Sequence, residues 1–380
     1  MRADDIIQMA RDKAQLNDFD AKGFREGLDL AVEALDANPL RTPQGKAFLM
    51  HMYSENLATR LKVADYARRH PEVRDQKIER PVFVMGMPRT GTTLASYLLG
   101  ADRNRRSLLR WEVAQPVPPP TTATLYSNPV IDAMYAFDED MEKAGRSFAA
   151  IHYEAPDGPT ECTFVMAHDF KSLFVESMSA WKGYSDWYLS ADLQSAYDYH
   201  RLYLQILQSQ APGCWALKLP SHALGIRTLM KMYPDARIIW THRDPYRSLN
   251  SLMSMISKAE LLSLSQSDHA HIRTTYPRQL HEHLARPMAV MAEQPTDPFY
   301  HLHYAALLRD PIGEMRALYG WLGDDFTPDV EARMRSWLAN NPQGRFGRHR
   351  YDFQQFGLTR DAVTPWFEAY LKMFDIEMEG

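Results

Sequence analysis

Cysteine is scarce in this chain: Cys162 and Cys214 are the only two among 380 residues. This count excludes a small fold held together by several disulfides, and it excludes a cysteine-rich metal cluster. The aromatic neighbours Phe164 and Trp215 predict that both thiols are buried. We therefore expect the protein to work in a reducing compartment.

Long hydrophobic runs are also absent. No stretch of about 18 apolar residues, the length needed to cross a bilayer, occurs in the sequence. The N-terminus, MRADDIIQMARDKAQL, has acidic residues early and apolar residues at helical spacing, unlike a signal or transit peptide. We expect a soluble, cytoplasmic protein without a membrane span.

The chain has no excess of positive charge. Its formal net charge is -5, which gives no support for general nucleic-acid binding. A hydrophobic content of 45% and an aromatic content of 11% exclude a disordered chain. Any anion-binding site in this protein must therefore be locally basic.

The most informative feature that is present is a phosphate-binding loop without its usual lysine, in the segment PVFVMGMPRTGTTLASYLL (81–99). The order of residues predicts a strand, a turn and a helix. Gly86 and Gly91 have the spacing of the G-x-x-x-x-G-K-[ST] loop, whose backbone N–H groups and helix N-terminus cradle an anion. Thr92 takes the lysine position, and Arg89 lies inside the turn. The expected anion is smaller than a triphosphate chain.

A second motif, ARIIWTHRDPYRSLNSLMSM (236–255), predicts a strand over 237–241, a charged turn and a helix beginning near Pro245. Arg243 leaves the carboxyl end of the strand, and Ser251 follows about two helical turns later. We expect both to face the crevice of the phosphate-binding loop. An arginine fork and a hydroxyl are suitable donors for phosphate oxygens.

Together these two motifs resemble the sulfotransferases that use 3'-phosphoadenosine 5'-phosphosulfate (PAPS). The resemblance implies that the loop holds the 5'-phosphosulfate, without a metal ion, and that Arg243 and Ser251 hold the 3'-phosphate. Arg89 is also expected to stabilise the leaving group, because a cation inside an anion loop suits that task. The loop residues expected to contact the donor are Arg89, Thr90, Gly91, Thr92 and Thr93.

Our first candidate for the catalytic base is Glu112, in LLRWEVAQP, at the end of a strand predicted over 107–113. Sulfotransferases that use a carboxylate base have a glutamate in a comparable place. A carboxylate in a partly apolar crevice beside Trp111 would have a raised pKa and could act near neutral pH. The structural alternative is an ion pair of Glu112 with Arg106 or Arg110.

The competing base is His222, in ALKLPSHAL, which follows a strand predicted over 215–219. The sulfotransferases of small phenols and steroids carry a lysine and a catalytic histidine there, at a shorter spacing. The resemblance implies that Lys218 contacts the transferring sulfo group or the 5'-phosphate, whereas His222 could instead cap the following helix. Glu161 and His152 are weaker candidates, for the wall of the acceptor site.

The C-terminal segment GRFGRHRYDFQQFGL resembles a G-x-H-x-Y segment found in bacterial sulfotransferases before a final helix. It adds Arg348 and Arg350 as candidates for closing over the nucleotide. The alternative is that these arginines are solvated residues of a surface loop.

The expected fold class is α/β, with a P-loop-like parallel sheet flanked by helices. Residues 1–79 read as a helical N-terminal extension, and residues 80–380 as the sulfotransferase domain. Within that domain, the aromatic-rich region 116–210 is expected to be a helical insertion on the acceptor side. The predicted strands lie near 81–85, 107–113, 215–219, 237–241 and 299–304.

The expected reaction moves the sulfuryl group from PAPS to a hydroxyl-type acceptor and releases adenosine 3',5'-bisphosphate. The sequence leaves the acceptor open among small molecules, lipids and glycans, and no pattern specifies the oligomeric state. One alternative is a small-molecule kinase that uses ATP and magnesium, which the threonine at position 92 disfavours. Another is a non-catalytic nucleotide-binding scaffold, which the presence of Arg89 and Glu112 disfavours.

Overall fold

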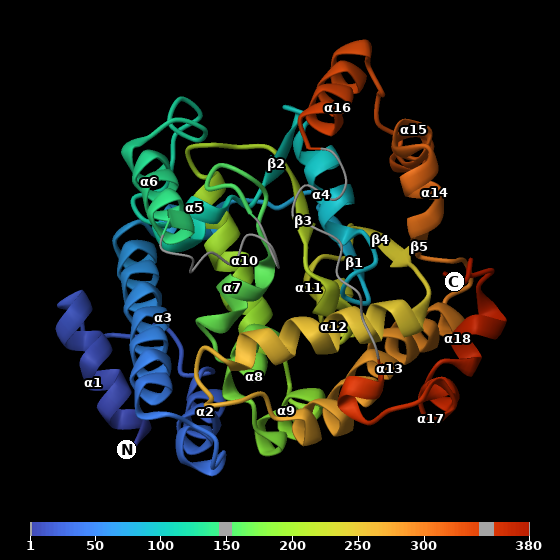
Figure 1. Ribbon diagram of the computed structural model, residues 1–380. Helices are drawn as coiled ribbons and strands as arrows, with labels where there is room; N and C mark the ends of the chain where they lie inside the picture. Colours follow the sequence, from blue (N-terminus) through green and yellow to red (C-terminus); the bar gives the residue numbers. More distant parts are fainter. Residues whose placement is uncertain (1, 144–153, 342–352, 380) are drawn as a thin grey trace.

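A five-stranded parallel sheet forms the centre of the protein in the computed structural model, which describes residues 2–143, 154–341 and 353–379 (Figure 1). The strand order is β2-β3-β1-β4-β5, and every neighbouring pair is parallel. The predicted α/β class, a parallel sheet flanked by helices, is confirmed. The strands are β1 (Val82–Gly86), β2 (Arg105–Ser107), β3 (Cys214–Lys218), β4 (Arg237–His242) and β5 (Phe299–His303).

The central strand β1 is the point where the connections change direction. It pairs with β3 through Val82 and Ala216, and with β4 through Gly86 and Thr241. The chain leaves β1 toward β2 and β3 and later crosses over to β4 and β5. In parallel sheets, such a switch point opens a crevice at the carboxyl ends of the strands, where ligands bind.

The described residues before β1 form helices joined by loops, as their apolar spacing predicts. After α1 (Ala3–Ala14) and α2 (Arg25–Ala37), the long helix α3 (Pro43–Arg69) leads into the short 3-10 helix η1 (Pro71–Asp75). The Thr42 side chain caps α3 by accepting the Gly45 N–H at 2.9 Å. These helices pack into the same hydrophobic core as the sheet.

One predicted strand is wrong for most of its length. Of the segment 107–113, only Ser107 belongs to a strand, as the last residue of β2, and the chain then turns into the helix α5 (Arg110–Ala114). The physical reason is local capping, because the Glu112 carboxylate accepts the Leu109 N–H at 3.0 Å and so starts a helix. The other four predicted strands are present within one or two residues.

The helix α12 (Pro245–Glu260) starts at the predicted proline. Asp244 caps it by accepting the Tyr246 N–H at 2.8 Å. This cap fixes the turn between β4 and α12, and Arg243 lies in that turn at the carboxyl end of the sheet.

The remaining helices cover both faces of the sheet. Before β3 they are α4 (Thr92–Gly100), α6 (Pro129–Lys143), α7 (Cys162–Ala167), α8 (Leu173–Ser179), α9 (Lys182–Ser190) and α10 (Gln194–Gln208). After β3 they are η2 (Pro220–Ala223), α11 (Ile226–Met232), α13 (His269–Glu293), α14 (Tyr304–Arg309), α15 (Pro311–Leu322), α16 (Pro328–Asn340), η3 (Phe353–Phe356), α17 (Arg360–Val363), η4 (Thr364–Trp366) and α18 (Glu368–Met373).

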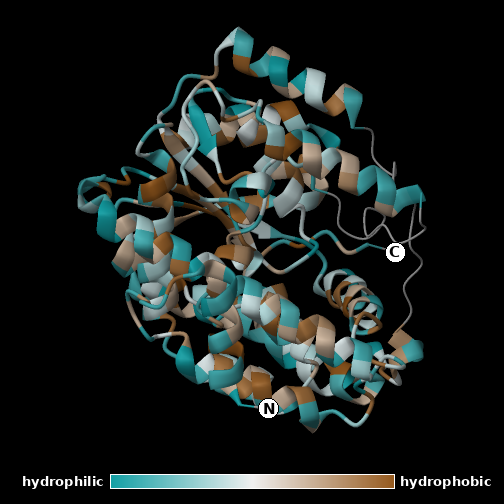
Figure 2. Cartoon of the chain, turned by 90° about the vertical axis from the view of Figure 1, so that its left-hand side faces the viewer, coloured by the Kyte–Doolittle hydropathy of each residue, from teal (hydrophilic) through white to brown (hydrophobic). Residues whose placement is uncertain are grey.

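Alternate residues of β1 belong to two different hydrophobic clusters. Phe83 and Met85 pack with α10, α12 and the N-terminal helices, whereas Val82 and Val84 pack with α4, α15 and α16. Burial on both faces explains why the strand is continuously apolar. Figure 2 shows the mostly hydrophobic strands in the interior and hydrophilic stretches on the outer helices.

Both cysteines are free thiols. Cys162 is buried, as predicted, but Cys214 is partly exposed because it opens strand β3 at the edge of the core. Within residues 2–143, 154–341 and 353–379, no helix combines the length and hydropathy needed to cross a bilayer.

Candidate active site

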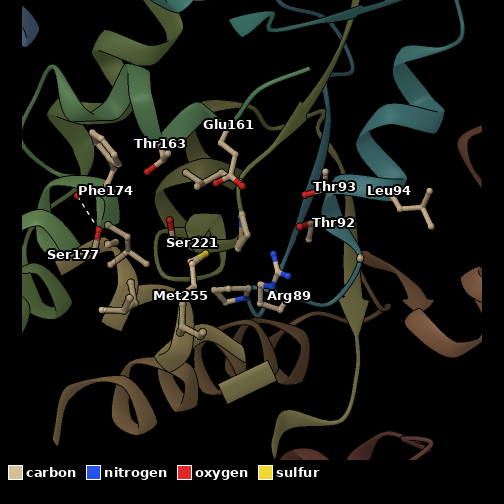
Figure 3. A pocket seen from close by; sticks show the side chains of 18 of the residues that line it. Arg89, Thr92, Thr93, Leu94, Glu161, Thr163, Phe174, Ser177, Ser221 and Met255 are labelled. Carbon is tan, nitrogen blue, oxygen red and sulfur yellow. Dashed lines mark hydrogen bonds between the residues drawn. The ribbon is translucent and has the colours of Figure 1, made fainter. Parts of the chain in front are cut away.

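A cavity of about 810 Å³ opens at the carboxyl end of the sheet. Its walls come from the β1–α4 loop, the segment after β3, helices α8, α12 and α13, and helices α14 and α16. Most of the lining is apolar, and a small set of polar side chains faces inward (Figure 3). In the part of the chain that the structure describes, no three metal-ligating side chains gather in this cavity or elsewhere.

The β1–α4 loop has a backbone that requires glycine at position 91. Gly91 has a φ of +89°, and a Cβ atom there would lie 2.7 Å from Cδ2 of Tyr304. Arg89 also adopts a left-handed conformation, with a φ of +69°. This conformation aims the N-terminus of α4 into the cavity, where its first N–H groups have no partner within the helix.

We expect Gly91→Ala to lower the free energy of unfolding by about 1–3 kcal/mol, because alanine is strained at this φ and collides with Tyr304. Thermal unfolding measures the change. Gly320→Ala is the matched control, because Gly320 lies in α15 with open space around its Cβ position. Equal stability of both variants would contradict the strained loop.

Thr90 differs from the other loop residues expected to contact the donor. Its side chain is fully buried, donates to the Met87 carbonyl at 2.6 Å and lies 2.5 Å from the Thr241 hydroxyl. It braces the loop against β4 and does not line the cavity. Thr92 and Thr93 do line it and bring two hydroxyl groups to the N-terminus of α4.

The two sequence motifs meet at this loop, as predicted. The Arg89 Nε donates to the Ser251 hydroxyl at 3.1 Å, and the Arg243 Nη1 donates to the Arg89 carbonyl at 2.7 Å. The Arg243 guanidinium also lies 4.2 Å from the ring centre of Tyr304. The cations of two segments more than 150 residues apart therefore lie at one end of the cavity.

A carboxylate from the C-terminal tail occupies the fork of Arg243. Glu379 accepts from the Arg243 Nη2 at 2.7 Å and from its Nε, and the Glu379 N–H donates to Asp244 at 3.1 Å. Arg243 and Tyr304 also line a second cavity of about 510 Å³, which adjoins this tail. The fork thus binds an anion in the structure, and that anion belongs to the protein itself.

Two further cofactor-binding candidates, Arg348 and Arg350, lie outside the described residues, as does His152.

Lys218 and Glu161 form a buried ion pair at the edge of the cavity. The Lys218 Nζ is 2.6 Å from one Glu161 oxygen and 3.5 Å from a Glu154 oxygen. Burial lowers the pKa of Lys218, but the Glu161 and Glu154 carboxylates outweigh it and raise that pKa above its ordinary value. Glu161 lines the cavity with its side chain 15% exposed, whereas Glu154 is not part of the lining.

Glu112, the first base candidate, is not in the cavity. Its carboxylate is fully buried, binds both Nη atoms of Arg106 and caps α5 through the Leu109 N–H. Because the carboxylate is buried in these contacts and lies outside the cavity, an acceptor hydroxyl cannot reach it. The structure thus realises the ion pair with Arg106 that was the structural alternative.

His222 is not in the cavity either. It lies in η2 and is fully buried, with its Nδ1 2.8 Å from the Tyr197 hydroxyl and its ring 5.0 Å from that of Phe83. Burial lowers its pKa well below the ordinary value, so the ring is neutral at physiological pH. The structure gives His222 a packing role within the core.

The ion pair of Glu161 with Lys218 was not predicted from the sequence. Glu161 was named only as part of the acceptor wall, in IHYEAPDGPTECTF. The contact that brings Glu161 to Lys218 is a single bridge between backbones 57 residues apart. No local pattern encodes that bridge. The position of Glu161, shortly after Gly158 and Pro159 and directly before a helix, was the available signal.

The comparisons with known proteins agree with the fold and the loop. A model of the sulfotransferase family matches residues 81–328. The crystal structure of sulfotransferase STF9 from Mycobacterium avium is 40% identical, covers 100% of this chain and 98% of its own, and superposes with a TM-score of 0.95. The structure of sulfotransferase STF1 from Mycobacterium tuberculosis H37Rv is 27% identical, covers 97% of this chain and 99% of its own, and has a TM-score of 0.87.

A curated relative, omega-hydroxy-beta-dihydromenaquinone-9 sulfotransferase Stf3 from Mycobacterium bovis, is 23% identical over 288 residues. The match covers 72% of this chain and 71% of that protein.

Proposed function

This chain belongs to the sulfotransferase family, and from that premise we propose that it transfers the sulfuryl group of PAPS to the hydroxyl of an apolar alcohol. The by-product is adenosine 3',5'-bisphosphate. The observation that carries the proposal is the meeting of Arg89, Arg243 and Glu161 around one largely apolar cavity. The two cations can bind the anionic donor, and the carboxylate can accept the proton of an acceptor hydroxyl.

The donor occupies the end of the cavity formed by the β1–α4 loop. The N-terminus of α4, with the hydroxyls of Thr92 and Thr93, binds the 5'-phosphosulfate. Arg243 and Ser251 bind the 3'-phosphate, because a guanidinium fork and a hydroxyl donate to phosphate oxygens. The contacts of Arg89 with Ser251 and Arg243 support this division, since they hold the two phosphate sites side by side.

Glu161 acts as the general base in this proposal. It accepts the proton of the acceptor hydroxyl as the oxygen bonds to sulfur, and the bond from sulfur to the phosphate oxygen breaks in line. The electron pair leaves on that phosphate oxygen, which Arg89 stabilises. Lys218 is a positioning residue, because its buried ammonium holds the Glu161 carboxylate at the cavity wall.

The apolar acceptor class follows from the lining and the rim. Phe48 and Leu262 line the cavity and remain 39% exposed, and the adjoining Leu261 is 56% exposed. Burying an apolar molecule there is favourable by roughly 25 cal/mol per Å² of apolar surface. The name of the relative Stf3, which describes a lipid acceptor, supports the same class.

We propose the same organisation of the chain as the sequence suggested: a helical extension over 1–79 and a catalytic domain over 80–380. The region 116–210 supplies the acceptor side, since it contributes Glu161 and the α8 wall to the cavity.

Calorimetric titration tests the donor assignment. We expect adenosine 3',5'-bisphosphate to bind without added metal and much more tightly than ADP. A preference for ATP with magnesium would favour a kinase instead, and binding of neither would favour a non-catalytic scaffold.

Glu379→Gln should tighten the binding of adenosine 3',5'-bisphosphate by about two- to fivefold, because the tail carboxylate competes with the 3'-phosphate for Arg243. The gain is small because the Glu379 side chain is one-third exposed. Glu377→Gln serves as the control, since Glu377 pairs with the exposed Arg309. Equal affinities in both variants would show that the tail does not compete.

A further inference from the structure

The wall of the cavity opposite the β1–α4 loop comes from helices α8, α12 and α13. Figure 3 shows Arg89, Thr92 and Thr93 on one side and Phe174 and Ser177 of α8 on the other. An acceptor whose hydroxyl reaches Glu161 must therefore extend along this far wall, so the groups on that wall contact the rest of the molecule.

Most of the far wall is apolar, with Leu173, Phe174 and Met178 from α8 and Leu252, Met255 and Ile256 from α12. Besides Ser177, whose hydroxyl donates to the Phe174 carbonyl at 3.0 Å, three polar side chains interrupt it. Glu176 on α8 and Tyr276 and Gln279 on α13 line the cavity, and each is 1% exposed. Polar groups buried in an apolar wall are costly unless they have hydrogen-bond partners.

The hydrogen bonds of these three residues are incomplete. Glu176 accepts from the Ser185 hydroxyl at 2.5 Å, and from the Tyr276 hydroxyl only at the long distance of 3.5 Å. The Gln279 side chain also lies beside the Glu176 carboxyl and favours its charged form. The buried Gln279 Nε2 nevertheless makes no hydrogen bond of normal geometry with any described residue. Burial also raises the pKa of Glu176 to about 7, so near neutral pH a large share of this carboxyl is uncharged. An acceptor oxygen is the group that would satisfy the Gln279 amide.

We propose that the natural acceptor has a second oxygen function, distant from the hydroxyl that is sulfated, and that Gln279 donates a hydrogen bond to it beside Glu176. The acceptor is then an apolar alcohol with a carbonyl, ether or hydroxyl oxygen along its far part. This inference rests on the proposed function and deepens it by naming a recognition element for the acceptor. Gln279 is a specificity residue in this scheme and takes no part in the chemical step.

The test compares two series of probes with the full chain and PAPS: straight-chain 1-alkanols of 8 to 16 carbons, roughly the range that spans such a pocket, and the matching ω-hydroxy-2-alkanones. We expect kcat/KM for the hydroxy ketone to exceed that for the alkanol by on the order of tenfold at one chain length, where the carbonyl reaches Gln279. A ratio near one at every chain length overturns the inference without any variant.

Gln279→Met removes the amide at nearly constant volume and should bring the ratio of hydroxy ketone to alkanol close to one. Gln205→Met is the matched control, because Gln205 is a buried glutamine outside the cavity that binds the Arg74 and Gln76 carbonyls. It should keep the preference of the unmodified chain. A preference that survives Gln279→Met overturns the assignment to Gln279.

Titration with adenosine 3',5'-bisphosphate separates this inference from the donor assignment. If the bisphosphate binds but no probe of either series is sulfated, the apolar acceptor class and the second oxygen contact both fail, while the donor site stands. If both series are sulfated equally well, only the second oxygen contact fails.

Discussion

Glu161→Gln is expected to lower kcat by about 10²- to 10⁴-fold, the usual contribution of a general base. The amide keeps the shape of the side chain but cannot accept the proton of the acceptor hydroxyl. The affinity for adenosine 3',5'-bisphosphate should change little, because Glu161 lies at the acceptor side of the cavity and pairs with Lys218. Single-turnover kinetics at saturating PAPS, alongside calorimetry of the bisphosphate, measure the two effects.

Glu154→Gln is the matched control for this prediction. Glu154 is a second buried carboxylate beside Lys218, at 3.5 Å, but it is not part of the cavity lining. Its replacement should lower kcat far less than Glu161→Gln. Equal losses would mean that both carboxylates act only through Lys218, and that neither is the base.

The Glu112→Gln variant tests whether Glu112, the first base candidate from the sequence, takes part in catalysis. This change leaves the buried Arg106 without its carboxylate, so it should reduce the free energy of unfolding by about 3–5 kcal/mol. The activity of the folded fraction should nevertheless stay close to that of the unmodified chain. Loss of turnover in stably folded Glu112→Gln protein, with Glu161→Gln active, would restore the original assignment.

Arg243→Ala is expected to weaken the binding of adenosine 3',5'-bisphosphate by roughly 10- to 150-fold, which corresponds to about 1.5–3 kcal/mol for a charged hydrogen-bonding partner. In the proposed site, Arg243 supplies the fork for the 3'-phosphate. Its Nη1 also supports the loop through the Arg89 carbonyl. Calorimetric titration at fixed ionic strength measures the change.

The control for Arg243→Ala is Arg227→Ala. It removes the same charge from an exposed ion pair with Glu293, outside both cavities. Its effect on the bisphosphate affinity should be within about twofold. An unchanged affinity in Arg243→Ala would contradict the 3'-phosphate assignment. It would also mean that Glu379 does not compete with the bisphosphate for Arg243.

The sequence predicted those parts of the site whose geometry is local. The strand, glycine turn and helix of 81–99 form one continuous segment, and so do the strand, arginine and capped helix of 236–255. Apolar strands, positive-φ glycine and Asp244 with Pro245 at a helix start are encoded within a few residues. Both motifs therefore form the predicted elements, and Arg243 faces the cavity as expected. Ser251 lines neither cavity and reaches the loop only through its contact with Arg89.

Prediction failed where a short apolar segment fitted more than one structure. The segment 107–113 has the composition of a strand, but a side chain that caps the backbone at Leu109 turned it into a helix. The hydrogen bond to the Leu109 N–H and the ion pair with Arg106 both bury Glu112, so its carboxylate does not face the cavity. Burial of such a pair depends on neighbours that the sequence does not specify locally.

By itself, the sequence determined the strand, glycine turn and helix of 81–99, the parallel α/β sheet and the position of Arg243 at the end of β4, because each depends on short-range backbone preferences and spacing. Only the tertiary structure decided which of the two carboxylates, Glu112 or Glu161, faces the cavity. Glu161 reaches it through a backbone bridge to the Lys218 strand, and Glu112 is withdrawn from it by an ion pair with Arg106. Long-range pairing and burial select among chemically equal side chains, and neither is written in the residues next to them.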